Sequence, residues 1–287
     1  MPGQWFRPSP APCNFCVALL PSAPRGPGHR FHRTPAVSVP TVARVAALID
    51  HTILKAEATR GDIETLCAEA RELEFAAVCV NPVWVPFCHD ALAGAPSLVA
   101  TVVAFPLGAA ELAAKANETA LAVSEGADEI DMVAAIGHIK SGDWAHVARD
   151  IAAVVHAAAG RVVKVIIESA VLTDDEITRA SVIARDAGAN FVKTSTGFHA
   201  AGGATLHAVS LIRRAVGDAT GVKASGGIRD CDAALRMLAA GATRIGTSSG
   251  VRIARCLDAD ATPLGELVNN PERHTACDTS RARSASA

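Results

Sequence analysis

The sequence predicts an α/β protein folded as a (β/α)8 barrel, also called a TIM barrel. Between about Thr41 and Leu257, short apolar runs rich in β-branched residues alternate with longer Ala-rich amphipathic runs. Most of the short runs are almost continuously apolar, as expected for parallel strands that are buried on both faces. Eight strand–helix pairs fit into this stretch of about 210 residues, which is close to the length of a typical barrel.

Eight strands are predicted, one at the start of each unit. They are Leu48–Leu54, Ala76–Val80, Leu98–Phe105, Glu129–Val133, Val162–Glu168, Asn190–Thr194, Gly221–Ser225 and Thr243–Thr247. An open doubly wound sheet is the alternative fold. Such a sheet would more often carry a Gly-rich turn after its first strand, and no G-x-G-x-x-G motif follows Leu48–Leu54. The repeated unit length also favours a closed ring.

The segments between the strands predict helices with recognisable ends. Thr59–Glu74 opens with Thr-x-x-Asp and Thr173–Gly188 opens with Thr-x-x-Glu, and both patterns are typical of capping boxes. Gly126, Gly188 and Gly241 each stand in a Gly-Ala pair just before a predicted strand, where a helix is expected to end.

The two ends of the chain differ in composition from the middle. Residues 1–40 hold nine prolines and no Asp or Glu, and they show no helical or strand period. A secretory signal would need a longer apolar core, and the prolines oppose the amphipathic helix of a transit peptide. We therefore expect a disordered extension at 1–40, a catalytic barrel at 41–257 and a disordered polar tail at 258–287.

Composition argues against several classes of partner. The formal net charge of −2 gives no support for nucleic-acid binding. No apolar run reaches the roughly 18 residues that a transmembrane helix needs. The eight cysteines are scattered, which predicts structural thiols in a reducing cytoplasm rather than a disulfide framework. The motif Cys13-x-x-Cys16 lacks the second pair of a typical zinc site.

Two lysines end consecutive predicted strands and give the main sign of chemistry. Lys193 and Lys223 end the short apolar runs at the start of two similar motifs, 30 residues apart. The motifs are Phe-Val-Lys-Thr-Ser-Thr-Gly and Gly-Val-Lys-Ala-Ser-Gly-Gly. Neighbouring parallel strands lie about 4.8 Å apart, so the two ammonium groups repel each other. Repulsion and burial both favour a neutral amine on one of them, and a neutral lysine can attack a carbonyl to form a Schiff base. Ordinary ion pairs are the alternative reading of each lysine.

A carboxylate faces the same end of the predicted barrel. Asp131 lies within the motif Glu-Ile-Asp-Met-Val, where it can pair with one lysine and share its proton in general acid–base steps. Lys164 lies earlier in its strand. We expect it to form a structural ion pair low in the barrel, with Glu168 or Asp131.

The last two strand-to-helix loops predict a phosphate site. Ser225-Gly-Gly-Ile-Arg229 follows the seventh strand and Gly246-Thr-Ser-Ser-Gly250 follows the eighth. Barrels often bind phosphate at this position through backbone N–H groups and a helix N-terminus. Two ordinary tight turns are the alternative. The residues expected to bind the substrate or its phosphate are Asp50, Thr52, Gly197, Gly226, Gly227, Gly246, Ser248 and Ser249.

The sequence gives no sign of a metal or another cofactor. None of the ten histidines forms an H-x-x-x-H or H-x-H pair inside a strand–helix unit. His51, on the first strand, is expected to be a packed polar residue rather than a ligand. A Schiff-base lysine needs no metal, so we expect no cofactor.

Eight motifs, in order, resemble the DeoC family of deoxyribose-phosphate aldolases. They are Leu48-Ile-Asp-His-Thr-Ile-Leu-Lys55, Val78-Cys-Val-Asn-Pro82, Phe105-Pro-Leu-Gly108, Gly126-Ala-Asp-Glu-Ile-Asp-Met-Val133, Lys164-Val-Ile-Ile-Glu168, Phe191-Val-Lys-Thr-Ser-Thr-Gly-Phe198, Val222-Lys-Ala-Ser-Gly-Gly-Ile-Arg229 and Arg244-Ile-Gly-Thr-Ser-Ser-Gly250. They are spread over roughly residues 44–253, about three quarters of the chain.

The resemblance implies a barrel enzyme of deoxyribose phosphate catabolism. Its implied reaction is the reversible cleavage of 2-deoxy-D-ribose 5-phosphate to D-glyceraldehyde 3-phosphate and acetaldehyde. It implies Lys193 as the Schiff-base lysine, and Asp131 and Lys223 as the proton-transfer pair. We expect a cytoplasmic homodimer or larger homo-oligomer that acts on a small sugar phosphate, with no nucleic-acid or membrane partner.

The chain departs from the family pattern at three places. Ala134-Ala-Ile-Gly137 stands where the family usually has Ile-Asn-Ile-Gly, and His199-Ala-Ala-Gly-Gly203 replaces Gly-Pro-Gly-Gly in a loop near the phosphate. Some members place a C-terminal tyrosine over the site, and this chain has no tyrosine. Any proton transfer that such a tyrosine assists must be absent here or replaced.

Two other functions use the same residues. A transaldolase-like transferase would keep Lys193 but take a different donor. A non-catalytic barrel that only binds sugar phosphates would be expected to have lost a lysine or the carboxylate, and Lys193, Lys223 and Asp131 are all present.

Overall fold

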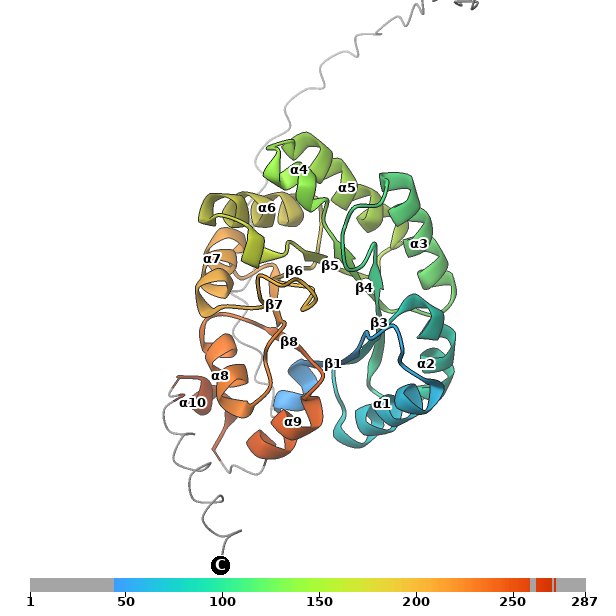
Figure 1. Cartoon of the computed structure of the whole chain (residues 1–287). Coiled ribbons are helices and arrows are strands. Elements are labelled where there is room, and N and C mark those ends of the chain that lie inside the picture. Colours follow the sequence, from blue (N-terminus) through green and yellow to red (C-terminus); the bar gives the residue numbers. More distant parts are fainter. Residues whose placement is uncertain (1–43, 259–261, 270, 272–287) are drawn as a thin grey trace, which may run out of the picture. The chain divides into compact units, whose positions relative to one another are not determined.

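The computed structural model describes residues 44–258, 262–269 and 271, and its eight parallel strands close into a barrel (Figure 1). The strands follow one another in chain order, and β8 pairs with β1 to close the ring. They are β1 Ile49–Ile53, β2 Ala77–Val80, β3 Leu98–Val103, β4 Glu129–Val133, β5 Val162–Ile166, β6 Phe191–Lys193, β7 Gly221–Ser225 and β8 Arg244–Thr247. The predicted barrel and its eight strands are confirmed, and the open-sheet alternative is wrong.

Helices surround the barrel as an outer ring (Figure 1). The α-helices are α1 Arg60–Leu73, α2 Val85–Ala91, α3 Leu112–Ser124, α4 Ile136–Lys140, α5 Trp144–Ala157, α6 Asp174–Asp186, α7 Leu206–Val216, α8 Cys231–Ala239, α9 Gly250–Asp258 and α10 Leu264–Asn269. Three short 3-10 helices are η1 Val45–Leu48, η2 Pro82–Trp84 and η3 Ser169–Val171. Both predicted capping boxes are present, at Thr59 before α1 and at Thr173 before α6.

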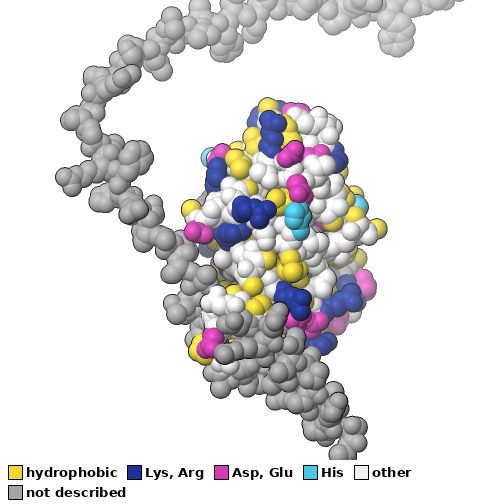
Figure 2. All heavy atoms as spheres, turned by 90° about the vertical axis from the view of Figure 1, so that its left-hand side faces the viewer, with side chains coloured by type: hydrophobic (Ala, Val, Ile, Leu, Met, Phe, Trp, Pro, Cys, Tyr) yellow, Lys and Arg dark blue, Asp and Glu magenta, His cyan; other side chains and the backbone are white. Residues whose placement is uncertain are grey.

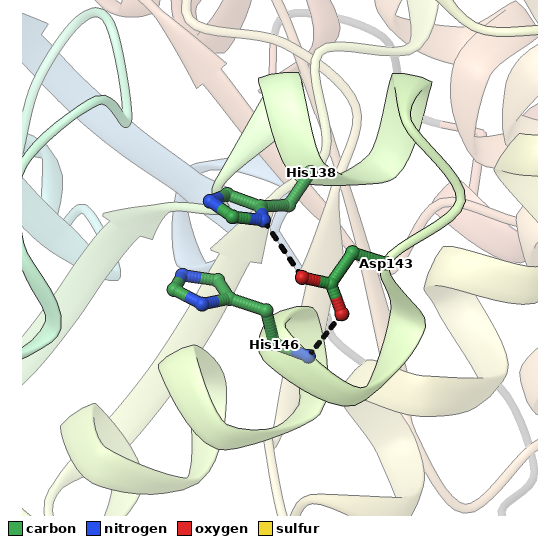
Figure 3. A group of neighbouring side chains, drawn as sticks. All are labelled: His138, Asp143 and His146. Carbon is green, nitrogen blue, oxygen red and sulfur yellow. Dashed lines mark hydrogen bonds and ion pairs between the residues drawn. The ribbon is translucent and has the colours of Figure 1, made fainter.

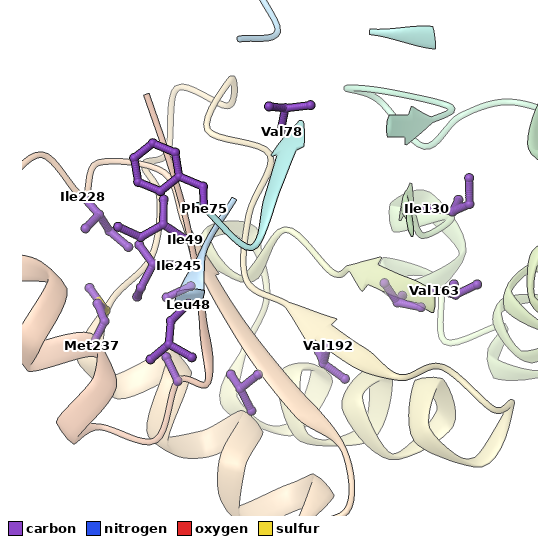
Figure 4. Packing of buried hydrophobic residues seen from close by; sticks show 14 of the residues in the cluster. Leu48, Ile49, Phe75, Val78, Ile130, Val163, Val192, Ile228, Met237 and Ile245 are labelled. Atoms are coloured by element: carbon purple, nitrogen blue, oxygen red, sulfur yellow. The ribbon is translucent and has the colours of Figure 1, made fainter. Parts of the chain in front are cut away.

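The two faces of each strand have different surroundings because successive side chains point to opposite sides of a sheet. Outward-facing residues pack under the helices, and several of them are seen in Figure 4. Those labelled there from the strands are Ile49, Val78, Ile130, Val163, Val192 and Ile245. Each charged residue next to one of these positions therefore faces the barrel interior, which places Asp50, Asp131 and Lys193 there.

Two strands end two residues earlier than predicted. The apolar pattern extends β3 to Phe105 and β5 to Glu168, but the strands stop at Val103 and Ile166. Ala104 and Glu168, which follow them, have φ angles of 52° and 54°. A strand cannot pass through this left-handed conformation, and apolar periodicity does not reveal it.

The cysteine prediction is wrong for one pair. Cys231 of α8 and Cys256 of α9 form a disulfide bond across a separation of 25 residues. The two helices follow neighbouring strands, so residues one strand–helix unit apart meet in space, which scattered spacing in the sequence does not show. Cys67, Cys79 and Cys88 are buried free thiols, as expected.

The prediction of a disordered tail from residue 258 is wrong for its described part. Asp258 ends α9, and α10 lies within the predicted tail. Leu264, Leu267 and Val268 face the core from this helix, and Leu267 is buried. The short apolar spacing on so brief a segment was too weak to predict a helix. The rest of the tail and the 1–40 extension lie outside the described residues.

The outer surface carries mixed charge. Figure 2 views the molecule from the side of α6, α7 and α8, where basic side chains lie among acidic ones and uncharged surface. No helix in the described ranges combines the length and the apolar character needed to cross a bilayer.

We expect the Thr173→Ala variant to lower the free energy of unfolding by about 1 kcal/mol. The Thr173 hydroxyl accepts a hydrogen bond from the Glu176 backbone N–H, and alanine leaves this donor at the start of α6 without a partner in the protein. Chemical denaturation measures the change. Thr178→Ala is the matched control, since Thr178 lies exposed inside the same helix and alanine favours a helix interior. Equal stability of the two variants would contradict the capping assignment.

Candidate active site

A group of charged side chains fills the interior of the barrel. Parallel pairing sets Lys193 of β6 directly beside Lys223 of β7, and Asp131 of β4 beside Lys164 of β5. Asp131, Lys164 and Lys223 have no solvent exposure, and Lys193 is 3% exposed. The predicted adjacency of the two lysines is therefore present.

Asp131 is the centre of this group because it accepts hydrogen bonds from three lysines. Its Oδ2 accepts from Lys193 Nζ at 2.7 Å and from Lys223 Nζ at 2.6 Å. Its Oδ1 accepts from Lys164 Nζ at 2.7 Å. Burial alone would raise the pKa of Asp131, but the charges of the three lysines outweigh burial and hold that pKa well below its usual range.

Further carboxylates hold Lys164 and Lys223. Lys223 Nζ donates to Asp50 Oδ2 as well as to Asp131. Lys164 Nζ lies 2.5 Å from Glu129 Oε2 and 2.7 Å from Asp131 Oδ1. The predicted ion pair of Lys164 with Asp131 is therefore present, whereas the alternative pair with Glu168 is not. Glu168 instead accepts a hydrogen bond from the Thr196 hydroxyl at 2.5 Å.

The interior network holds one more cationic side chain than it holds carboxylates. Its members are Lys164, Lys193, Lys223 and Arg244 on one side and Asp50, Glu129 and Asp131 on the other. A buried charge without a countercharge is costly, so the network favours the loss of one proton from a lysine.

The partners decide which lysine has the lowered pKa. Burial lowers the pKa of Lys193, and the neighbouring Lys223 charge lowers it further against the attraction of Asp131. Burial acts in the same direction on Lys223, but Asp131 and Asp50 together raise its pKa above the ordinary value. Within the described chain, Lys193 has Asp131 as its carboxylate partner and Lys223 has two such partners. Lys193 is thus the better nucleophile.

Lys193 reaches a pocket of about 690 Å³. The pocket lies among the loops that follow β1, β6, β7 and β8, where barrels carry their chemistry. Asp131, Lys164 and Lys223 are absent from its wall and have no solvent exposure. A molecule in the pocket therefore meets the amine of Lys193, with the proton-carrying network behind it.

Most residues predicted to bind substrate or phosphate line this pocket. They are Thr52, Gly197, Gly226, Gly227, Gly246 and Ser248. Asp50 is not in the pocket wall, because it is buried in the network and bonded to Lys223 and Arg244. Ser249 is not in the wall either, and its backbone N–H donates to Thr247 Oγ1 at 2.9 Å.

Close backbone contact between two loops requires glycine. A Cβ on Gly203 would lie 2.3 Å from the carbonyl oxygen of Gly226, so the loops after β6 and β7 could not approach as they do. Gly226 also has a φ of 89°, which favours glycine. Gly203 belongs to the segment in which this chain departs from the family pattern, and its glycine keeps this contact.

Several residues of the site were not predicted from the sequence. Lys55 and Arg229 line the pocket and add positive charge beside the glycine loops. Arg229 stands two residues after the Gly-Gly pair, a signal that could have been used. Arg244 donates to Asp50 Oδ1 at 2.6 Å and reaches Glu129 as well, and no motif marks this partnership.

His51 is placed as predicted. It is buried, its Nε2 lies 2.7 Å from Glu69 Oε2, and its ring packs against Phe75. These contacts are those of a packed polar residue on the helix side of β1.

The family is decided by comparison with known proteins. The model of the DeoC/LacD family aldolases matches residues 44–255. The chain belongs to this family. It is therefore an aldolase, an enzyme of the aldehyde-lyase class.

The matches to curated relatives in the family extend over almost the whole length of each relative. A deoxyribose-phosphate aldolase of Streptococcus uberis is 53% identical over 210 residues, which are 73% of this chain and 95% of the relative. One from Lysinibacillus sphaericus is 54% identical over 217 residues, which are 75% of this chain and 97% of the relative. The match leaves out the ends of the chain, where the composition also changes.

Solved structures of family members have the same fold. The deoxyribose phosphate aldolase of Aeropyrum pernix, described as a unique tetramer, superimposes with a TM-score of 0.70 at 33% identity, over 75% of this chain and 91% of the other. An aldolase designated QR15 gives a TM-score of 0.71 at 39% identity, over 75% of this chain and 96% of the other.

We expect Lys164→Met to lower the free energy of unfolding at pH 7 by about 3–5 kcal/mol, because it removes the buried cation that lies 2.5 Å from Glu129 Oε2 and 2.7 Å from Asp131 Oδ1. The loss should shrink as the pH falls. A carboxylate with a depressed folded-state pKa, such as Asp131, contributes stability above its unfolded pKa and loses that contribution as the pH drops through its folded pKa. Urea denaturation at several pH values measures both effects.

The control for this prediction is Lys140→Met. Lys140 makes an ion pair with Glu176 at 2.8 Å, but its side chain is 45% exposed, so its loss should cost no more than about 1 kcal/mol. Equal losses for the two variants would show that the interior network does not depend on Lys164.

Proposed function

We propose that this aldolase cleaves 2-deoxy-D-ribose 5-phosphate reversibly to D-glyceraldehyde 3-phosphate and acetaldehyde, through a Schiff base on Lys193. The observation that carries the proposal is the position of Lys193, which has a lowered pKa, in the wall of the pocket. The printed names of the curated relatives support the substrate.

The chemistry begins at the substrate aldehyde. The neutral amine of Lys193 adds to carbon 1, water leaves, and the imine takes up one proton from the neighbouring Asp131–Lys223 pair, which gives a protonated imine. A base removes the proton from the hydroxyl on carbon 3, and the bond between carbons 2 and 3 breaks. Its electron pair moves into the imine to form an enamine, and D-glyceraldehyde 3-phosphate departs. The enamine then takes a proton on carbon 2, and water releases acetaldehyde and Lys193.

Asp131 and Lys223 are assigned the proton transfers. Asp131 Oδ2 accepts a hydrogen bond from Lys193, and Lys223 donates to the same oxygen. A proton can therefore pass among the three side chains over hydrogen-bond distances. The raised pKa of Lys223 favours its charged form between turnovers, so its charge stands beside Lys193 when the imine forms. Asp50 holds Lys223 in place from the opposite side, which gives it a positioning role rather than the substrate contact predicted from the sequence.

The phosphate group is assigned to the loops after β6, β7 and β8. Backbone N–H groups of Gly197, Gly226 and Gly227, the residue Ser248 and the start of α9 offer donors and a helix dipole. Lys55 and Arg229 add two cationic side chains to the same pocket. Thr52 lines the wall on the side of β1.

The wider setting is part of the proposal. We assign the enzyme to the cytoplasm and to the breakdown of deoxyribose phosphate, with no cofactor in the reaction. The tetramer described for the Aeropyrum pernix enzyme supports a homo-oligomer here. Acetaldehyde release from 2-deoxy-D-ribose 5-phosphate tests the reaction, because a transaldolase-like transferase would release none.

We expect borohydride reduction in the presence of substrate to attach the reduced two-carbon or five-carbon fragment to Lys193. Mass spectrometry of the peptide that contains Lys193 measures the adduct. Lys193→Met should remove both the adduct and the turnover. An adduct on Lys223 or Lys164 would overturn the assignment.

We expect Lys223→Leu to slow imine formation at neutral pH, and a higher pH to rescue it partly. Without the Lys223 charge the pKa of Lys193 rises, and each unit of increase leaves about tenfold less free amine. Lys223→Arg keeps the charge but cannot release a proton in the working range, so it should form the imine yet turn over slowly. Wild-type pH profiles of trapping and turnover in both variants would reduce Lys223 to a structural partner.

A further inference from the structure

A second group of chemically active side chains lies outside the pocket, at the corner between α4 and α5. It consists of His138, Asp143 and His146 (Figure 3). Their ligand atoms all lie within 4.8 Å of one another, and none of the three lines the pocket. In the described part of the chain, no other group of three or more His, Cys, Asp or Glu residues meets this criterion.

We propose that His138, Asp143 and His146 form a surface site for a divalent transition-metal ion of the zinc type. Two imidazole nitrogens and one carboxylate oxygen suit Zn²⁺, Ni²⁺ or Cu²⁺, whereas Mg²⁺ and Ca²⁺ prefer oxygen ligands alone. Three protein ligands leave the remaining coordination positions to water.

The backbone holds the ligands together before any ion arrives. The Asp143 backbone N–H donates to the His138 carbonyl oxygen at 2.9 Å, across the turn at Gly142. Asp143 is also the N-cap of α5, where its Oδ1 accepts from the His146 backbone N–H at 3.1 Å. Its Oδ2 lies 3.1 Å from His138 Nδ1. The carboxylate is thus fixed between the two histidines.

The side chains are ready to bind and free to adjust. The two imidazole rings stack with centroids 3.6 Å apart and an interplanar angle of 9°. The ligand atoms of a tetrahedral zinc ion lie about 3.4 Å apart and all point toward the ion. The two rings must therefore turn out of their parallel stack to bind the same ion. His138 and Asp143 are nearly half exposed, which allows the rotation.

The search for short histidine spacings in the sequence missed this group. His138 and His146 are eight residues apart and belong to different helices. The tight turn between α4 and α5 brings them face to face. The sequence predicted no metal site of any kind, so the site proposed at this corner departs from that prediction, although it lies outside the pocket.

Titration calorimetry of the full-length protein with ZnCl₂ tests the proposal. We expect saturable binding of one ion per chain at this corner and a rise in the melting temperature of a few degrees. His138→Ala and His146→Ala should each weaken this binding by at least about tenfold, since even loss of a residue that only supports a ligand costs that much. Asp143→Ser should do the same while keeping the cap of α5. Turnover should stay unchanged in all three variants.

Two controls separate this corner from other ligands. His207 is an exposed histidine paired with Asp174, so His207→Ala should bind zinc as the wild type does. Co²⁺ should give a spectrum without the intense thiolate charge-transfer band that cysteine ligands produce. No saturable binding, equal binding after loss of His138 or His146, or a thiolate band in place of nitrogen ligation would each overturn the proposal.

Discussion

One buried carboxylate carries the organisation of the active site. Asp131 accepts hydrogen bonds from three lysines inside a barrel that excludes water from it. A single negative charge cannot balance three positive ones, and two more carboxylates join it: Asp50 from β1 and Glu129 from β4 itself. The balance is complete only when one lysine is neutral. Closure of the barrel is what brings carboxylates from β1 and β4 to lysines from β5, β6 and β7.

The role of each charged side chain depends on its depth in the barrel. Lys193 is the member of the network that reaches the pocket, while Asp50, Asp131, Lys164 and Lys223 behind it have no solvent exposure. Gly246 joins the two levels. A Cβ at this position would lie 2.3 Å from Ser225 Oγ and 2.9 Å from Lys223 Cε. Glycine is thus needed by the packing of Lys223 below, as well as by the pocket above.

Sequence patterns predicted the parts of this arrangement that depend on local order. Apolar runs gave all eight strands, and the interval between Lys193 and Lys223 gave their adjacency. These patterns did not reveal which of the two lysines has the lowered pKa, because that depends on carboxylates from β1 and β4. The role of Asp50, the Cys231–Cys256 bond and the histidine pair at the α4–α5 corner were hidden for the same reason. Each depends on residues that meet only after the chain folds, and no short motif encodes such a meeting.

A buried charged network of this kind is not needed to stabilise the fold, which supports a catalytic role for it. Replacing buried ion pairs with apolar side chains of similar volume is often neutral or stabilising, since two desolvated charges repay their cost only with good geometry. The same barrel has an apolar alternative on its own inner wall, where Ala77, Cys79, Ala100 and Val102 form a small cluster between β2 and β3. The other strands could have continued that cluster. They instead carry charges whose arrangement lowers the pKa of one lysine at the pocket. A perturbed lysine with specific partners in a pocket is what a Schiff-base reaction requires, and an apolar interior could not provide it.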